Sequence, residues 1–134
     1  MFLLDTDVIS EARKASGDAG VKEWRAGVSG EQLYLSVLTV GEIRQGIERL
    51  RGREPDQAAV FEEWLLRLCR DYSERIIPVN ANIAGQWGRL NASAPLPAVD
   101  GLLAATAMVR KMTLVTRNTA DVSRTGAKLL NPFV

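Results

Sequence analysis

The sequence contains no histidine and only one cysteine, Cys69, among its 134 residues. Without histidine, the chain cannot build a Ser-His-Asp or Cys-His nucleophile, a histidine general base or a His-ligated zinc site. One cysteine excludes an internal disulfide and a cysteine-rich zinc site. Apolar residues around Cys69 follow helical spacing, which indicates a small core side chain. Carboxylates, hydroxyls, amides, lysine and arginine remain for chemistry, and carboxylates without histidine suit a hard cation such as Mg²⁺ or Mn²⁺.

Long apolar runs are also missing. No run approaches the roughly 18 residues of a membrane span, and the apolar stretch before Asp5 is too short for the core of a secretory signal peptide. We therefore expect a cytoplasmic protein that does not enter a membrane. Apolar residues make up 46% of the sequence and charged residues 25%, which is typical of a globular chain. The length predicts a single domain over residues 1–134.

The net charge is only +1, but the charges are unevenly placed. Residues 1–43 carry four basic and seven acidic side chains, whereas residues 101–134 carry five basic and one acidic. An acidic first part and a basic last part can fold into a site with anionic ligands at its floor and cations at its rim. The net charge by itself does not indicate nucleic-acid binding.

Short apolar runs alternate with longer helical patterns along the chain. The clearest helical stripe has apolar residues spaced 3, 4 and 3 apart, at Val40, Ile43, Ile47 and Leu50. Strands are predicted at 2–4, 33–35, 76–79, 113–115 and 129–130. Pro78 predicts an edge position for the third of them. This alternation predicts an α/β fold with right-handed crossovers and a mostly parallel sheet covered on both faces.

Polar residues follow the predicted strands, at Asp5, Ser36, Asn80, Thr116 and Asn131. In open α/β sheets the ligand crevice lies at the carboxyl ends of the strands. We therefore expect Asp5 and the loop 116–121 to lie at one edge of the sheet, where chemistry takes place.

Four carboxylates are candidates for that chemistry, and each also has an ordinary local interpretation. Asp5 can cap the next helix, although Asp7 is the better cap candidate and frees Asp5. Thr39 to Glu42 match a capping box, in which the Glu side chain bonds back to the start of its helix. Asp100 lies in the first turn of an apolar helix, where the dipole favours an anion. Asp121 fits a turn followed by a short capped helix.

The four carboxylates together are more informative than any one of them. Two unit charges about 4 Å apart cost about 4 kcal/mol at an effective dielectric of about 20. Either some of them are protonated or a divalent cation lies among them, and without histidine the cation is the simpler solution. Bound Mg²⁺ or Mn²⁺ activates water and stabilises charge on a phosphoryl group. Basic residues of the last part can hold a phosphate backbone: Arg110, Lys111, Arg117, Arg124 and Lys128.

Four segments, in order, resemble the four motifs of PIN-domain proteins: Leu4–Ser10, Ser36–Ile47, Pro97–Ala107 and Leu114–Asp121. The ending Lys128–Phe133 resembles the VapC/FitB branch of that family. Each motif is weak alone, but their order and spacing agree over essentially the whole chain. The resemblance implies a three-layer α/β/α sandwich and a metal-dependent endoribonuclease using Mg²⁺ or Mn²⁺.

The resemblance also implies partners. Members usually act on RNA as the toxin of a type II toxin–antitoxin pair, form homodimers and are blocked by a small DNA-binding antitoxin over the active site.

The family's acidic positions carry over to Asp5, Glu42, Asp100 and Asp121, with Asp5 and Asp100 as the most direct metal ligands. Side chains that orient these ligands are expected at Thr6, Thr116 and Asn118, and RNA-binding side chains at Arg117, Arg124 and Lys128.

Three positions depart from the family pattern. Val122 replaces a usually aromatic residue, which affects packing of the fourth motif. Asn118 stands where some branches carry another carboxylate, so the negative charge is lower and a metal would be held more loosely. Lys111 stands where related chains often have a helix-ending glycine.

Two other functions fit parts of the sequence. Residues 2–8 also fit the opening aspartate motif of haloacid-dehalogenase-type phosphatases, in which Asp5 would be the nucleophile. That chemistry needs an acidic pair after a late lysine, and no acidic residue follows Lys128. A non-catalytic PIN-like binding module is the other alternative, which the presence of all four acidic residues disfavours.

Overall fold

The fold is built on a five-stranded sheet with the strand order β3-β2-β1-β4-β5, in which every pair of neighbours is parallel. The structure is a computed structural model that describes all of residues 1–134. The strands are β1 (Phe2–Leu4), β2 (Leu33–Ser36), β3 (Ile76–Ile77), β4 (Thr113–Val115) and β5 (Leu129–Leu130). All five predicted strands are confirmed, and β3 is an edge strand, as Pro78 predicts, although it ends at Ile77.

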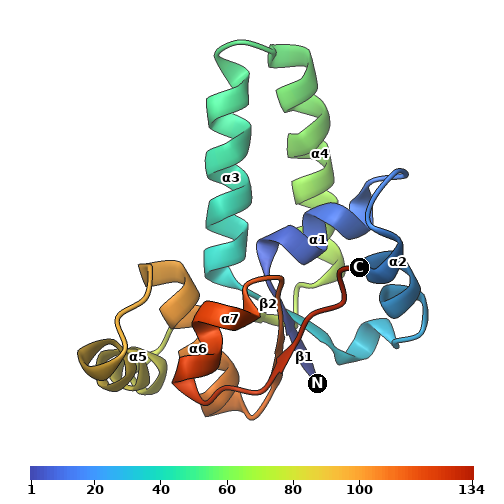
Figure 1. Ribbon diagram of the computed structural model, residues 1–134. Helices are drawn as coiled ribbons and strands as arrows, with labels where there is room; N and C mark the ends of the chain where they lie inside the picture. The colour runs from blue at the N-terminus through green and yellow to red at the C-terminus, as the bar shows by residue number, and fades with distance from the viewer.

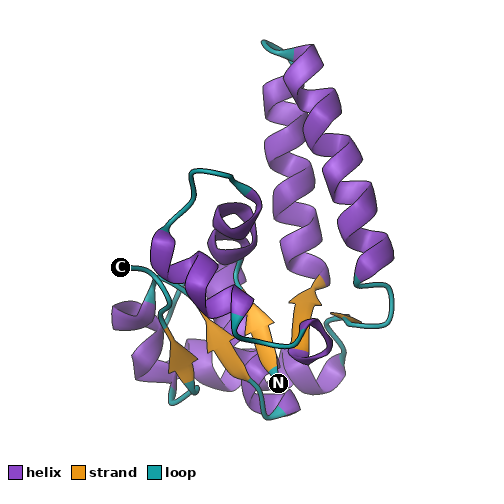
Figure 2. Ribbon diagram, turned by 90° about the vertical axis from the view of Figure 1, so that its right-hand side faces the viewer, coloured by secondary structure: helices purple, strands orange, loops and turns teal.

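The helices are α1 (Thr6–Arg13), α2 (Ala19–Ala26), α3 (Val37–Arg51), α4 (Pro55–Asp71), α5 (Ala81–Ser93), α6 (Ala98–Arg110) and α7 (Thr119–Val122). Short 3-10 turns lie at Gly30–Gln32 and Ser123–Thr125. The helices cover both sides of the strands (Figures 1 and 2). None of them is both long and apolar enough to cross a bilayer.

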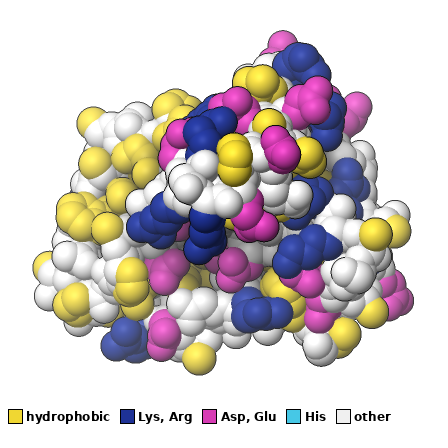
Figure 3. Space-filling view, turned by 90° about the horizontal axis from the view of Figure 1, so that it is seen from above, with side chains coloured by type: hydrophobic (Ala, Val, Ile, Leu, Met, Phe, Trp, Pro, Cys, Tyr) yellow, Lys and Arg dark blue, Asp and Glu magenta, His cyan; other side chains and the backbone are white.

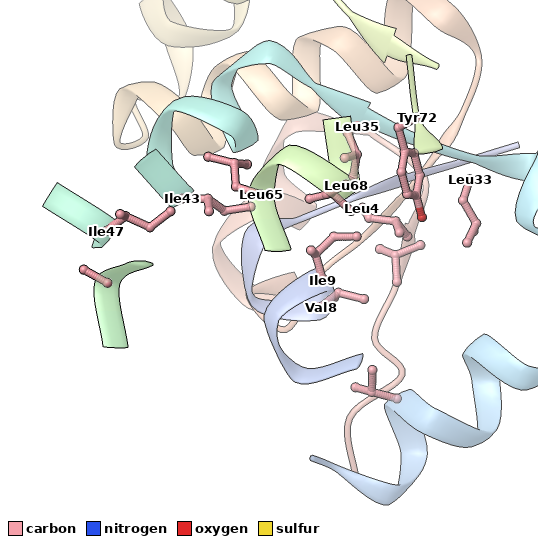
Figure 4. Packing of buried hydrophobic residues seen from close by; sticks show 13 residues of the cluster. Leu4, Val8, Ile9, Leu33, Leu35, Ile43, Ile47, Leu65, Leu68 and Tyr72 are labelled. Atoms are coloured by element: carbon pink, nitrogen blue, oxygen red, sulfur yellow. The ribbon is translucent and has the colours of Figure 1, made fainter. Parts of the chain in front are cut away.

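Two hydrophobic cores lie on the two faces of the sheet. Successive strand residues point to opposite faces, and accordingly the neighbours Leu3 and Leu4 belong to different cores, as do Leu114 and Val115. Helices α1 to α4 pack on the face that carries Leu4, as Figure 4 shows. Helices α5, α6 and α7 pack on the other face. The predicted α/β/α sandwich is therefore confirmed.

The α3–α4 hairpin stands away from the rest of the molecule (Figures 1 and 2). Along α3, Ile43 and Ile47 of the predicted stripe are buried in the first core, and Val40 and Leu50 pack against that core. Cys69 of α4 also packs against it and is partly buried, as predicted. The stripe therefore belongs to the interior of the protein.

Three helix starts show which residues cap them. Asn80 caps α5, since its side chain accepts a hydrogen bond from the backbone N–H of Ile83 at 3.0 Å. Helix α4 begins at Pro55, whose fixed φ suits a first helical position, and Asp56 lies in its first turn. Helix α3 begins at Val37 and is capped by Ser36, not by Thr39.

Candidate active site

The site begins where two neighbouring strands end. Asp5 directly follows β1 and Thr116 directly follows β4, which pairs with β1. The parallel register brings both residues to the carboxyl edge of the sheet, where the Thr116 hydroxyl donates to Asp5 Oδ2 at 2.8 Å. Thr116 is buried and Asp5 is partly buried. The predicted meeting of Asp5 with the loop 116–121 is therefore confirmed.

Asp5 has both of its carboxylate oxygens engaged. It is the N-cap of α1, and its Oδ1 accepts from the Thr6 N–H at 2.7 Å. The prediction that Asp7 is the cap is wrong, because Asp5 has the extended backbone of a cap residue and Asp7 already lies inside the helix. Burial raises the pKa of Asp5, hydrogen bonds from Thr116 and Thr6 oppose this, and the negative charges of Asp7 and Asp100 add to it.

Glu42 joins Asp5 through Thr6. The Thr6 hydroxyl donates to Glu42 Oε1 at 2.5 Å, while its backbone N–H bonds to Asp5. The capping-box interpretation of Thr39 and Glu42 is wrong, because both residues lie inside α3. Glu42 is therefore directed to α1 and the sheet edge.

Asp100 joins the same network from α6. It lies in the first turn of that helix, as predicted, and its Oδ2 accepts from the Asn118 side-chain amide at 3.3 Å. The Asn118 backbone N–H donates to the Thr116 hydroxyl at 3.1 Å. Hydrogen bonds therefore run without a break from Asp5 through Thr116 and Asn118 to Asp100.

Asp121 does not join this network. Its side chain is exposed on the four-residue helix α7 and takes part in none of the ion pairs. The structure contains no group of three or more acidic side chains close enough to hold an ion. It brings Asp5, Glu42 and Asp100 together through hydroxyl and amide groups, and the four-carboxylate ligand set stays a prediction.

The candidate RNA-binding residues differ in their placement. Arg117 lies between Thr116 and Asn118, is exposed, and has its guanidinium 4.0 Å from the centre of the Phe133 ring. Arg124 is exposed in the turn after α7. Lys128 immediately precedes β5 and so lies at the amino end of the sheet, away from Asp5. Of the three, Arg117 is the one whose chain neighbours contact the site carboxylates.

A cavity of about 320 Å³ adjoins the network, and sequence analysis did not predict it. Thr6 and Glu42 form part of its wall, and Arg13 lies on its lining, over the rings of Phe61 and Trp64 at 4.6 and 5.2 Å. No local pattern signals this cavity, because it forms only when α1 packs beside the α3–α4 hairpin. Figure 3 shows acidic side chains in a hollow with Lys and Arg side chains around it.

The protein is an α/β/α sandwich that carries acidic side chains at the carboxyl edge of its parallel sheet. The chain belongs to the PIN-domain family, which matches residues 2–128.

Within the family, the chain is similar over its whole length to two named proteins. It is 30% identical to VapC ribonuclease Y4jK of Sinorhizobium fredii, over 99% of this chain and 98% of that protein. It is 31% identical to toxin FitB of Neisseria gonorrhoeae, over 99% of both.

The chain is also similar to solved structures over nearly its whole length. The crystal structure of FitAcB from Neisseria gonorrhoeae has a TM-score of 0.91 at 30% identity and covers 98% of both chains. The structure of VapBC2 from Rickettsia felis, bound to a DNA fragment from its promoter, has a TM-score of 0.73 at 20% identity over 97% of both chains, which is a likeness of fold.

Proposed function

We propose that this protein is a metal-dependent endoribonuclease and the toxin of a toxin–antitoxin pair. The observation that carries the proposal is the hydrogen-bonded path from Asp5 to Asp100, whose two carboxylates pair with no cation of the protein. The similarity to a VapC ribonuclease and to toxin FitB, each over 99% of this chain, supports the assignment.

The residues at the sheet edge fit a hard divalent cation. The side chains there offer carboxylate, hydroxyl and amide oxygens, the ligands that Mg²⁺ and Mn²⁺ prefer. Mg²⁺ is usually held by one or two carboxylates together with water molecules, so Asp5 and Asp100 are sufficient protein ligands. Glu42 and Asp121 would complete the site directly or through water. When bound, such an ion lowers the pKa of water and stabilises negative charge on a phosphoryl group.

The chain's own residues prepare the site for this reaction. Thr6 and Thr116 each hold one oxygen of Asp5, which fixes the orientation of its carboxylate. Asn118 does the same for Asp100 through its side-chain amide. Hydrogen bonds of this kind, made to the groups that bind a metal, are worth about 10- to 100-fold in metal affinity or activity.

The proposed partners follow from the relatives. The structures of FitAB bound to a DNA fragment and of VapBC2 bound to promoter DNA hold toxin–antitoxin complexes. We propose a small DNA-binding antitoxin for this chain as well, a homodimer as its own assembly, and the cytoplasm as its location. Co-expression with the product of a short neighbouring reading frame tests the partner: the pair should co-purify, and growth should be impaired only when the toxin is expressed alone.

The activity is tested with purified protein and a single-stranded RNA. We expect cleavage with Mn²⁺ or Mg²⁺, none in EDTA, and none by Asp5→Ala or Asp100→Ala. Glu48→Ala is the matched control, since it removes a carboxylate on the α3–α4 hairpin, and it should cleave like the wild type. Equal cleavage in all samples would indicate a contaminating nuclease and contradict the proposal. A covalent phosphate on Asp5 would favour the phosphatase instead.

A further inference from the structure

Arg117 is an arginine without an acidic partner beside a group of acidic residues. Its chain neighbours Thr116 and Asn118 bond to Asp5 and Asp100, yet Arg117 takes part in no ion pair. Its guanidinium lies instead over the ring of Phe133, 4.0 Å from the ring centre. The positive charge of Arg117 therefore lies on an aromatic ring and is not neutralised by an acid of the protein.

Stacking leaves the hydrogen-bonding capacity of this arginine intact. The ring covers one face of the guanidinium, whereas the five N–H donors point outwards in its plane. That geometry matches the oxygens of a phosphate, which arginine binds through two parallel hydrogen bonds. Arg117 is therefore oriented by an aromatic face and is open to an anion at its edge.

Phe133 is itself held in place by the start of α2. The Asp18 carboxylate accepts from the Val134 N–H at 3.2 and 3.4 Å and also caps α2 through the Val21 N–H at 3.1 Å. Gly20 permits the close approach of this segment, because a Cβ there would lie 2.2 Å from the Pro132 carbonyl oxygen. Segment 131–134 is thus fixed against α2, where Figure 1 shows it ending.

We propose that Arg117 binds a phosphate of the RNA strand next to the scissile bond and that Phe133 is the positioning residue that holds it there. This inference rests on the proposed function, and it adds segment 131–134 to the substrate site. Residues far apart in the chain then act in series: the start of α2 fixes Phe133, Phe133 orients Arg117, and Arg117 holds the backbone beside Asp5 and Asp100.

The test measures RNA binding separately from cleavage. The dissociation constant of a fluorescein-labelled single-stranded RNA is measured in EDTA, where no cleavage takes place, and KM and kcat are measured with Mn²⁺. We expect Arg117→Gln to weaken binding by about tenfold, the low end for a charge-assisted hydrogen bond. It should also reduce the slope of log affinity against log salt by about 0.7, the value for one phosphate contact on a single strand. Arg89→Gln removes an equal charge from an exposed position on α5 and should change binding less than about twofold.

Phe133 variants separate positioning from simple packing. Phe133→Leu keeps an apolar side chain against the core but removes the ring, and it should weaken binding by about threefold. Phe133→Trp keeps a ring face and should bind like the wild type. Phe133→Leu should raise KM more than it lowers kcat. In the double variant with Arg117→Gln, it should cause no further loss of RNA binding.

The outcomes distinguish this inference from the proposed function. If the wild type binds RNA but Arg117→Gln behaves like Arg89→Gln, the inference is overturned, as it is if Phe133→Leu lowers the Tm without affecting binding. A wild type that does not bind RNA in EDTA overturns it as well. If RNA binding depends on Arg117 but no RNA is cleaved with either metal, the nuclease assignment fails and the phosphate contact stands.

Discussion

The acidic side chains of the α3–α4 hairpin and those at the carboxyl edge of the sheet have opposite electrostatic surroundings. On the hairpin, Glu48 and Glu62 each bond to two arginines, and these bonds hold the pKa of both carboxyls below its ordinary value. At the sheet edge, Asp5 and Asp100 accept hydrogen bonds from neutral groups only, and burial raises the pKa of Asp5.

The paired charges of the hairpin favour stability, whereas the unpaired carboxylates of the sheet edge suit the binding of a cation. On the hairpin, Arg44 and Arg51 each form ion pairs with both Glu48 and Glu62, so the acidic charges are neutralised. The sheet edge leaves its acids without a counter-charge, although Arg117 lies between Thr116 and Asn118, whose side chains bond to those acids. Leaving partly buried carboxylates unpaired costs stability, and such conflicts with stability are expected at functional sites.

The largest expected effect is on activity. Asp100→Asn keeps the size of the side chain and removes its charge, so the cation should be lost from the site and kcat should fall more than about a hundredfold. Glu62→Gln makes the same chemical change on the hairpin and should leave kcat unchanged. Initial rates of RNA cleavage at saturating Mn²⁺ measure both variants. Equal losses in the two would end the distinction between the two regions.

A smaller loss is expected when a group that orients a site carboxylate is removed. Asn118→Ala deletes the amide that donates to Asp100 and should lower activity by about 10- to 100-fold. Asn82→Ala, an exposed position on α5, is the control. Asn118→Asp should bind Mn²⁺ more tightly than the wild type, because it adds a negative charge. Titration of cleavage rate against Mn²⁺ concentration checks this, and an unchanged metal requirement in all three would argue against a role for Asn118.

The same contrast predicts the direction of a pH effect on stability. The pKa of Asp5 is higher in the folded chain than in the unfolded one, so the unfolded chain loses this proton first as the pH rises, and stability falls until the folded group has ionised. Asp5→Asn removes that cost. In EDTA, the Tm of the variant relative to the wild type should therefore increase from about pH 3 to about pH 7, across the ionisation of a carboxyl group. A difference that stays constant or decreases would show that burial does not penalise the Asp5 charge.

The strands and the sheet edge were predictable from sequence because they depend on local apolar runs and on a general rule for parallel sheets. The contacts of the individual carboxylates were harder to predict from sequence. The capping interpretation of Glu42 rested on Thr39, three residues away, whereas its actual donor is Thr6, which reaches it only after α1 packs beside α3. Asp5 does cap α1 with one oxygen, while its other oxygen accepts from Thr116 at the sheet edge.

Two further features could not be predicted from local sequence patterns. Arg117 was identified by its charge, but its stack on Phe133 joins the loop after β4 to a segment that is held by α2. Asp121 fits the motif in sequence, yet the four-residue helix α7 leaves its side chain exposed. In both cases the deciding contacts, or their absence, depend on tertiary packing.

The smallest expected effect concerns the stability of the hairpin. Glu62→Gln removes the carboxylate that accepts from both Arg44 and Arg51, at 2.5 and 3.0 Å. Because these side chains are well exposed, the Tm should fall only slightly, and high salt should remove most of the difference from the wild type. The pKa of Glu62 is lowered in the folded chain, so this stabilisation is present at neutral pH and is lost as the pH falls through that lowered value. Thermal unfolding at low and high salt and at neutral and acidic pH measures both trends, and a large loss of Tm that persists at high salt would mean that the hairpin depends on its ion pairs as strongly as the sheet depends on its cores.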